Sequence, residues 1–267
     1  MTLDDRVAFR FASLASLPLV HGMSGRRIGD GHEGDVGHGR GTTPEVIETN
    51  RTAFLDAMAI DPEALTVGRQ THGNHVEVVD AGSRGRGRYP AFDGFPTTDG
   101  LVTADPSVAL GVIVADCVPL VIYDPVAHAV GVVHAGWRGT VGRIAAAAID
   151  TMREAFRSDP ADLRVGIGPS IGPCCYEVGA EVVDAWRGTG VDRAEEAIVA
   201  GGSHFDLWSA NRLALIAAGV AERNIEVSGV CVRCQVERFF SYRAAGSGAA
   251  TAGRMLMVAQ LSERSEP

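Results

Sequence analysis

The feature that most constrains this chain is a pair of apolar segments in the middle of the sequence, separated by a short turn. Residues Ala109–Tyr123 and Ala129–His134 are rich in the β-branched side chains that suit a pleated, half-buried surface. The stretch Asp124–His128 between them has the composition of a turn. The sequence therefore predicts a β-hairpin. With the turn centred near residues 125–126, Cys117 falls opposite His134 or one place away, and directly opposed residues have Cβ atoms roughly 4.5–5.5 Å apart.

A helical pattern follows the hairpin. Apolar residues recur from Val141 to Phe156 at the i, i+3, i+4, i+7 spacing of a helix that faces a core. Thr140 is the expected N-cap, and Arg138 lies just before it in a Gly-Trp-Arg-Gly segment. The start of such a helix carries unpaired N–H groups that attract anions. We expect it to bind phosphate beside Arg138.

The length and net charge of the chain limit the number of domains and the kinds of partner that it can have. With 267 residues, of which 46% are hydrophobic, the chain can bury one large core, and we expect a single domain over residues 1–267. The net charge of −9 argues against nucleic acid and anionic membranes as partners. Met1–Asp5 lacks the basic start of a signal peptide, and no apolar run is long enough to span a bilayer, which predicts a cytoplasmic protein.

The flanking sequence predicts a mixed α+β architecture. Strands and helices are interspersed without strict βαβ alternation, which favours layered mixed sheets over a doubly wound parallel sheet. The Gly- and Arg-rich residues 81–99 are interpreted as a surface excursion. The predicted outer elements are a helix over Pro44–Ile60 capped by Thr43, short strands within Leu65–Val79, strands over Leu101–Ala104, Leu163–Ile167, Ile225–Val232 and Arg254–Leu261, and helices over Glu177–Trp186 and Phe205–Ala218, the last capped by Asp206.

Cys117 and His134 are the strongest candidates for chemistry. A thiolate and an imidazole at hairpin spacing can share a metal ion, or act as a nucleophile and its base. A catalytic zinc site needs a third protein ligand, and His72 and His75 are equal candidates from spacing alone. His32 and His38, in a Gly-rich loop, are interpreted as exposed loop histidines.

The remaining cysteines and charged residues carry weaker signals. Cys231 and Cys234 form a C-x-x-C pair without two further ligands at matching spacing, so we interpret them as buried structural thiols. Cys174 and Cys175 are adjacent and are assigned to packing. The five cysteines argue against a disulfide scaffold. Strand alternation predicts that Asp116 faces away from Cys117.

Several ordered motifs between residues 20 and 260 resemble the polyphenol-oxidoreductase (laccase-domain) family of purine nucleoside phosphorylases. The motifs are Gln70-Thr71-His72-Gly73, Asp99-Gly100, Ala115-Asp116-Cys117-Val118-Pro119, His134-Ala135-Gly136-Trp137-Arg138-Gly139, Gly168-Pro169-Ser170-Ile171-Gly172-Pro173 and Phe239-Phe240-Ser241-Tyr242-Arg243. The resemblance implies a single-domain α/β/β/α sandwich and a zinc site on His72, Cys117 and His134, which would be the catalytic residues. Copper is the weaker alternative metal.

The resemblance also implies substrates. These are phosphate with adenosine, inosine or S-methyl-5'-thioadenosine for phosphorolysis, and adenosine for deamination by the same site. Arg138 and Arg243 are the expected phosphate-binding residues. Asp35 lies near the place of a family asparagine, so it is expected in the substrate site, where its charge would alter the substrate range. The sequence does not disclose the oligomeric state.

Three other functions compete with this interpretation. A cysteine hydrolase using Cys117 and His134 is the main alternative, and cell-wall precursors are a candidate substrate class. A multicopper phenol oxidase would need many histidines, commonly in His-x-His pairs, whereas this chain has eight histidines and no such pair. A non-catalytic binding protein would tolerate Cys117→Ala.

Overall fold

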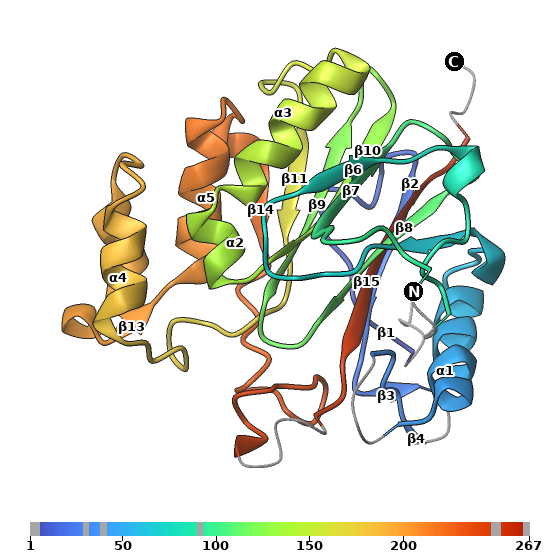
Figure 1. Ribbon diagram of the computed structural model, residues 1–267, viewed down its shortest axis with the longest axis horizontal. Coiled ribbons are helices and arrows are strands. Elements are labelled where there is room, and N and C mark those ends of the chain that lie inside the picture. The colour runs from blue at the N-terminus through green and yellow to red at the C-terminus, as the bar shows by residue number, and fades with distance from the viewer. Residues whose placement is uncertain (1–5, 29–31, 38–41, 90–92, 247–251, 264–267) are drawn as a thin grey trace.

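Two mixed β-sheets pack face to face, and helices cover their outer faces (Figure 1). The computed structural model describes residues 6–28, 32–37, 42–89, 93–246 and 252–263. The arrangement is an α+β fold with the layer order α/β/β/α, which confirms the predicted fold class.

The bounds of the elements are as follows, for the described part of the chain. One sheet has the strand order β1 (Val7–Phe9), β2 (Leu19–Ser24), β15 (Met255–Leu261), β8 (Ala109–Val114) and β5 (Leu65–Val67). The other has the order β14 (Ile225–Val227), β11 (Arg164–Ile167), β9 (Val118–Asp124), β10 (Ala129–Ala135), β7 (Gly100–Thr103) and β6 (Val76–Val78). Smaller pairs join β3 (Arg27–Ile28) to β4 (His32–Glu33) and β12 (Ile198–Val199) to β13 (His204–Phe205). The α-helices are α1 (Pro44–Ala57), α2 (Trp137–Val141), α3 (Ile144–Phe156), α4 (Ala180–Arg187) and α5 (Leu207–Ala217). Short 3-10 turns are η1 (Pro62–Ala64), η2 (Ala81–Ser83), η3 (Ala194–Ala197), η4 (Ala200–Gly202) and η5 (Glu222–Asn224).

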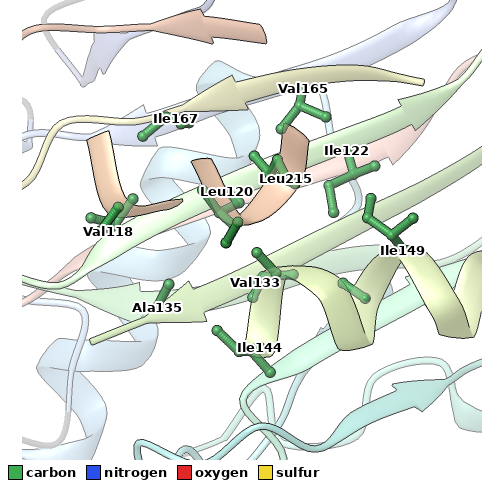
Figure 2. Packing of buried hydrophobic residues seen from close by; sticks show 14 of the residues in the cluster. Val118, Leu120, Ile122, Val133, Ala135, Ile144, Ile149, Val165, Ile167 and Leu215 are labelled. Carbon is green, nitrogen blue, oxygen red and sulfur yellow. The ribbon is translucent and has the colours of Figure 1, made fainter. Parts of the chain in front are cut away.

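Successive side chains of β9 alternate between two hydrophobic cores, one on each face of its sheet. Leu120 and Ile122 point to the helices, where they join Ile149 of α3 and Leu215 of α5 (Figure 2). The intervening Val121 belongs instead to the core between the two sheets. Successive side chains of a strand point to opposite faces, so a strand buried on both sides reads as a continuous apolar run.

The outer face of the five-stranded sheet packs against α1. Leu256 and Val258 of β15 share a core with Phe54 and Met58, at the α1 end of the molecule. Met257, between them in the sequence, lies in the core between the sheets. Alternation of side chains along β15 therefore contributes to a third hydrophobic core, between the five-stranded sheet and α1.

The first apolar run is two strands rather than one. β8 ends at Val114 in the five-stranded sheet, and β9 begins at Val118 in the six-stranded sheet, with a bend over residues 115–117. The prediction of one strand over Ala109–Tyr123 is therefore wrong. Both strands are buried on both faces, so the hydrophobic pattern carries no mark of the crossing between sheets.

The predicted hairpin exists, but its register differs from the expected one. Ala129 pairs with Asp124, and His134 pairs with Pro119. The turn is centred later than expected because Asp124 Oδ1 accepts hydrogen bonds from the N–H groups of Val126 at 2.8 Å and Ala127 at 2.9 Å. Cys117 is thus two residues beyond the partner of His134, on the bend, and diagonal neighbours of this kind lie on the same face.

The helix after the hairpin is broken. α2 is a five-residue helix whose N-cap is Gly136, and Thr140 lies inside it, so the prediction of Thr140 as N-cap is wrong. Arg143 adopts a left-handed backbone with φ 63°, and α3 begins after it. A five-residue helix has only a small dipole. The predicted phosphate site therefore depends on side chains rather than on a helix start.

The other helices agree with the sequence more closely. α1 has Thr43 at its N-cap and Pro44 in its first turn, and it ends at Ala57, three residues before the predicted end. α5 is capped by Asp206, whose side chain accepts from the N–H groups of Trp208 and Ser209. Across the described ranges, no helix combines the length and the apolar character needed to cross a lipid bilayer.

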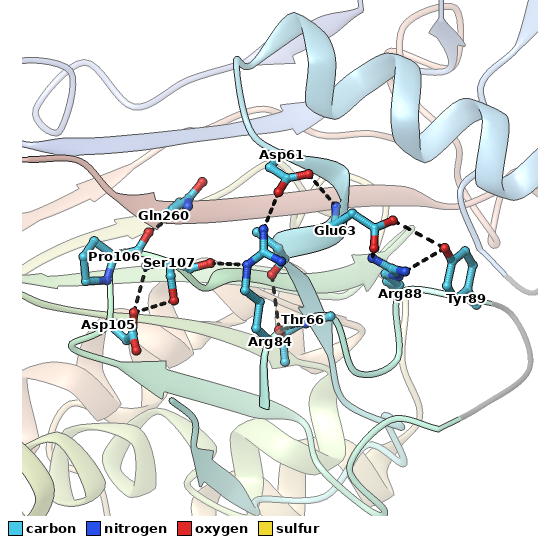
Figure 3. Close-up of polar contacts among 12 residues, drawn as sticks. Asp61, Glu63, Thr66, Arg84, Arg88, Tyr89, Asp105, Pro106, Ser107 and Gln260 are labelled. Carbon is cyan, nitrogen blue, oxygen red and sulfur yellow. Dashed lines mark hydrogen bonds and ion pairs between the residues drawn. The ribbon is translucent and has the colours of Figure 1, made fainter. Parts of the chain in front are cut away.

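Polar contacts tie the excursion after Asp80 back to the body of the molecule (Figure 3). Arg84 forms an ion pair with Asp61 and donates from Nε to the carbonyl of Ser107 at 3.0 Å. Arg88 forms an ion pair with Glu63 of η1. This segment is a surface excursion as predicted, and two of its residues, Gly87 and Gly94, line the pocket described next.

Candidate functional site

A cavity of about 670 Å³ opens where the bend between β8 and β9 meets the loop after β5 and the start of α2. That volume suits a ligand of small-molecule size. The polar and aromatic residues of its wall are Arg69, Gln70, His72, Asp116, Cys117, His134, Trp137, Arg138, Tyr176, Tyr242, Arg243 and Arg254.

His72, Cys117 and His134 meet in the wall of this cavity. Each residue offers one ligand atom, and the three atoms lie within 4.8 Å of one another. The two imidazole rings are edge to face, with centroids 4.8 Å apart. His72 comes from the loop after β5, Cys117 from the bend before β9, and His134 from β10. The hairpin supplies two of the three groups, and tertiary packing supplies the third.

Asp99 organises two of these groups. Its carboxylate is fully buried and accepts hydrogen bonds from the backbone N–H groups of Thr71 at 3.0 Å, His72 at 2.9 Å and Gly73 at 2.9 Å. It also accepts from Nδ1 of His134 at 2.8 Å. These contacts hold His72 in a left-handed backbone conformation, with φ 61°. They also fix the tautomer of His134, whose Nε2 is left as the donor atom for a ligand.

The sequence interpretation gave Asp99 no role. Asp99-Gly100 is among the motifs that carry the family resemblance, but an Asp-Gly pair before an apolar strand by itself indicates only a turn. Burial alone would raise the pKa of Asp99, but hydrogen bonds from His134, Thr71 and Gly73 outweigh it and lower the pKa to about 2. Asp99 is therefore a carboxylate at neutral pH.

Cys117 and His134 shift each other's pKa values in opposite directions. Desolvation by itself would raise the pKa of Cys117, but the neighbouring His134 and His72 lower it to about 6. Desolvation would likewise lower the pKa of His134, but the Cys117 thiolate and Asp99 raise it to about 9. Without a bound metal, the two groups form a thiolate–imidazolium pair at pH 7.

The donor set fits a metal ion. One thiolate and two imidazoles form the N/S set that zinc and copper ions accept, and Asp99 holds one imidazole as metal sites commonly require. His75 does not join them. It is exposed, and its Nε2 lies 3.1 Å from Glu77 Oε2. The choice between His72 and His75, which spacing left open, is thus decided by position.

Four arginines surround the cavity. Arg138 stacks on Trp137, with its guanidinium carbon 4.3 Å from the ring centroid. Arg243 lies over Tyr176 at 5.2 Å and donates from Nη1 to the carbonyl of Glu177 at 2.8 Å. Arg69 and Arg254 complete the set. Guanidinium groups recognise phosphate and carboxylate in a bidentate manner, so this wall favours an anion.

Asp116 lies in the wall of the same cavity, which corrects the prediction that it faces away from Cys117. Residues 115–117 form a bend, where strand alternation does not apply. Its carboxylate accepts from Ser241 Oγ at 2.7 Å and from the N–H of Arg243 at 2.7 Å. Burial raises its pKa above the ordinary value. Asp116 thereby fixes the loop that carries Tyr242 and Arg243.

Asp35 does not line the cavity. Its buried carboxylate accepts from the N–H groups of Gly37 at 3.0 Å and Arg254 at 2.8 Å, and from Thr42 Oγ1 at 2.6 Å. It therefore reaches the cavity through Arg254, and its effect on substrate range stays a prediction. His38 and the side chain of His32 lie outside the described residues.

Comparison with known proteins gives a consistent answer. Residues 21–262 match the family model described as multi-copper polyphenol oxidoreductase laccase. A Bacillus subtilis purine nucleoside phosphorylase, YlmD, is 38% identical over 73% of this chain and 70% of its own length. An adenosine deaminase from an unknown prokaryotic organism is 40% identical over 73% of this chain and 76% of its own length. The crystal structure of YlmD from Geobacillus stearothermophilus has a TM-score of 0.86 at 34% identity and covers 95% of this chain and 94% of that chain. The chain is therefore an enzyme that belongs to the multi-copper polyphenol oxidoreductase laccase family.

Proposed function

We propose that this enzyme is a zinc-dependent purine nucleoside phosphorylase that also deaminates adenosine. Its substrates would be phosphate with adenosine, inosine or S-methyl-5'-thioadenosine. The observation that supports this most directly is the meeting of His72, Cys117 and His134 in the wall of an arginine-lined cavity. The printed names of the relatives, a phosphorylase and a deaminase, support the same two activities.

His72, Cys117 and His134 would hold the zinc ion and would be the catalytic residues. When bound, zinc supplies a Lewis acid that activates water for the hydrolytic deamination at purine C6. Copper remains the alternative metal. A multicopper phenol oxidase is disfavoured because eight histidines without a His-x-His pair do not suit several copper ions.

Phosphorolysis would use the charge of the cavity wall. Arg138 and Arg243 would hold phosphate for attack on the anomeric carbon of the ribose. The C–N glycosidic bond breaks, the purine leaves with its bonding electron pair and gains a proton, and the new C–O bond gives ribose 1-phosphate. Positive charge develops on the sugar in the transition state, and the bound phosphate anion stabilises it.

The purine would bind against aromatic side chains. Trp137, Tyr176 and Tyr242 all line the cavity, and their flat faces match a purine ring in size. Tyr176 is half-buried beneath Arg243, and burial raises its pKa to about 12. Tyr242 is 50% exposed, and the guanidinium carbon of Arg254 lies 5.5 Å from the centroid of its ring.

The direct test combines product analysis with metal analysis. Purified protein of measured zinc content is incubated with adenosine, with and without phosphate, while adenine, inosine and ribose 1-phosphate are followed. We expect ribose 1-phosphate and adenine only with phosphate, and inosine in both cases. His72→Ala should lose both activities, whereas the matched variant His75→Ala, at an exposed residue paired with Glu77, should keep them. Absence of product from every purine nucleoside would overturn the proposal.

A cysteine hydrolase is the second candidate, and one observation favours it. The lowered pKa of Cys117 and the raised pKa of His134 describe an activated thiolate beside an acid group. Chelation separates the two candidates. A thiol hydrolase keeps its activity toward amide bonds, such as those of cell-wall precursors, after metal removal, while the proposed phosphorylase loses its activity and regains it with zinc.

A further inference from the structure

Outside the pocket, the four remaining cysteines of the chain come together. The Sγ atoms of Cys174, Cys175, Cys231 and Cys234 lie within 4.8 Å of one another. Cys234 Sγ lies 3.6 Å from Cys174 Sγ and 3.4 Å from Cys175 Sγ. Cys231 is buried, Cys175 is half-buried, and the other two are exposed.

This cluster corrects the sequence interpretation, which assigned the two pairs separately to structure and packing. Residues 173–175 form a turn, so Cys174 and Cys175 do not alternate as they would in an extended chain. The loop after β11 and the loop after β14 run side by side, joined by a parallel bridge between Ser170 and Cys231. The C-x-x-C pair thereby gains two further thiols from a segment about 60 residues away.

We propose that these four cysteines bind a divalent metal of the zinc type as a tetrathiolate site. Zinc–sulfur bonds of about 2.3 Å place the four sulfurs of a tetrahedral site about 3.8 Å apart. The observed separations of 3.4 and 3.6 Å, with all pairs within 4.8 Å, are close to that value. They exceed the disulfide bond length of about 2.05 Å, and all four cysteines are free thiols.

The surroundings of the cluster suit a negatively charged metal–thiolate centre. The backbone N–H of Gly172 donates to Cys231 Sγ at 3.2 Å. Arg233, inside the C-x-x-C pair, forms a hydrogen bond with the Cys175 sulfur. Four thiolates around a divalent ion leave two excess negative charges, and a guanidinium and an N–H donor offset part of them.

The position of the cluster points to a structural role for the bound metal. The first loop carries the cavity residues Ile171 and Tyr176, and the second leads into Tyr242 and Arg243. The two loops are also joined by a hydrogen bond, which Arg243 donates to the carbonyl of Glu177, two residues after Cys175, at 2.8 Å. A metal that joins the two loops would therefore fix one wall of the substrate cavity. The metal site itself does not depend on the proposed function.

The test counts metal ions per chain. We expect wild-type protein to hold two zinc equivalents, one at each cluster, when it is purified under reducing conditions or reconstituted with zinc. The Cys174→Ser/Cys234→Ser double variant, which changes the two exposed thiols, should lose one equivalent. Cys117→Ser is the matched control, because it removes a thiol from the other site and should leave the tetrathiolate metal in place.

Cobalt substitution gives a second, spectroscopic readout of the same site. Reconstituted wild-type protein should show intense thiolate-to-cobalt charge-transfer absorption, which persists in Cys117→Ser and disappears in the double variant if that variant folds. The proposal is overturned by one equivalent of metal in wild-type protein that is lost in Cys117→Ser. It is equally overturned by a thiol titration that finds a disulfide among these four cysteines, or by free thiols that bind neither zinc nor cobalt.

Discussion

His134 donates its Nδ1–H to Asp99 Oδ1 at 2.8 Å, and both side chains are buried. The same two residues are also joined through the backbone, since the N–H of His134 donates to the carbonyl of Asp99 at 2.7 Å. Because Asp99 additionally accepts from three consecutive N–H groups of the His72 loop, one carboxylate sets the positions of two of the three groups proposed as metal ligands.

Asp99→Asn removes the charge and turns one acceptor oxygen into an NH₂ group that faces N–H donors. We expect the affinity for zinc to fall by about 10–100-fold, the usual effect of losing a partner that orients a ligand. Phosphorolysis should fall with it at limiting zinc. Zinc binding is measured by competition with a chromophoric chelator. Asp150→Asn, at an exposed residue paired with Arg153 on α3, is the control. Unchanged affinity in Asp99→Asn would remove the role assigned here to this carboxylate.

Gly136→Ala tests the space around the three proposed ligands. A Cβ at Gly136 would lie 3.0 Å from Cys117 Sγ and 3.0 Å from His72 Cδ2, although its backbone is one that alanine adopts readily. We expect at least a tenfold loss of zinc affinity because the added methyl separates the two side chains. Gly73→Ala is the matched control, since its Cβ would meet nothing closer than 3.5 Å. An equal effect of both substitutions, measured by the same competition assay, would contradict a steric cause.

Arg138→Met tests phosphate binding separately from purine binding. Methionine keeps much of the apolar contact with Trp137 but removes the charge. A charge-assisted hydrogen bond contributes about 1.5–3 kcal/mol, so the KM for phosphate should rise by about 10–100-fold. The KM for adenosine in deamination, which uses no phosphate, should change much less. Arg153→Met on α3 is the control. If both KM values rise equally, Arg138 contacts the nucleoside instead.

His21 makes the stability depend on pH. Burial lowers its pKa below the ordinary value of 6.5, and its Nε2 accepts from the N–H of Phe11 at 3.0 Å. Above pH 6.5 the group is neutral in both the folded and the unfolded chain and has no effect. As the pH falls below 6.5, the unfolded chain gains a proton that the folded chain resists, so stability is lost with a slope of at most about 1.4 kcal/mol per pH unit.

The measurement compares urea unfolding at pH 7.5 and pH 5.5 for wild-type protein and His21→Gln. The amide retains an acceptor for Phe11 but does not titrate, so the variant should lose less stability between the two pH values. His75→Gln, at an exposed site, should behave as wild type. An identical loss in His21→Gln would show that other groups cause the acid sensitivity.

Local rules in the sequence determined much of the secondary structure. Proline at the start of α1, Asp206 at the cap of α5, and the turn residues after Asp124 act within a few positions, so they can be identified without knowledge of the fold. The hairpin register was predicted to place Cys117 opposite His134 or one place away, whereas His134 pairs with Pro119. The turn is set by hydrogen bonds that the Asp124 carboxylate accepts from the N–H groups of Val126 and Ala127, and composition does not reveal them.

The tertiary structure decided which residues from distant parts of the sequence come together in the two clusters. The sequence identified Cys117 and His134 as a candidate pair from spacing, which left His72 and His75 equal, and its family motifs favoured His72. It could not show that Asp99 accepts from both the His72 loop and His134, nor that the Cys174–Cys175 loop lies against Cys231 and Cys234. These contacts join segments 26 to 60 residues apart. Spacing and periodicity report only on neighbours within one element, whereas such long-range contacts depend on how whole sheets and loops pack.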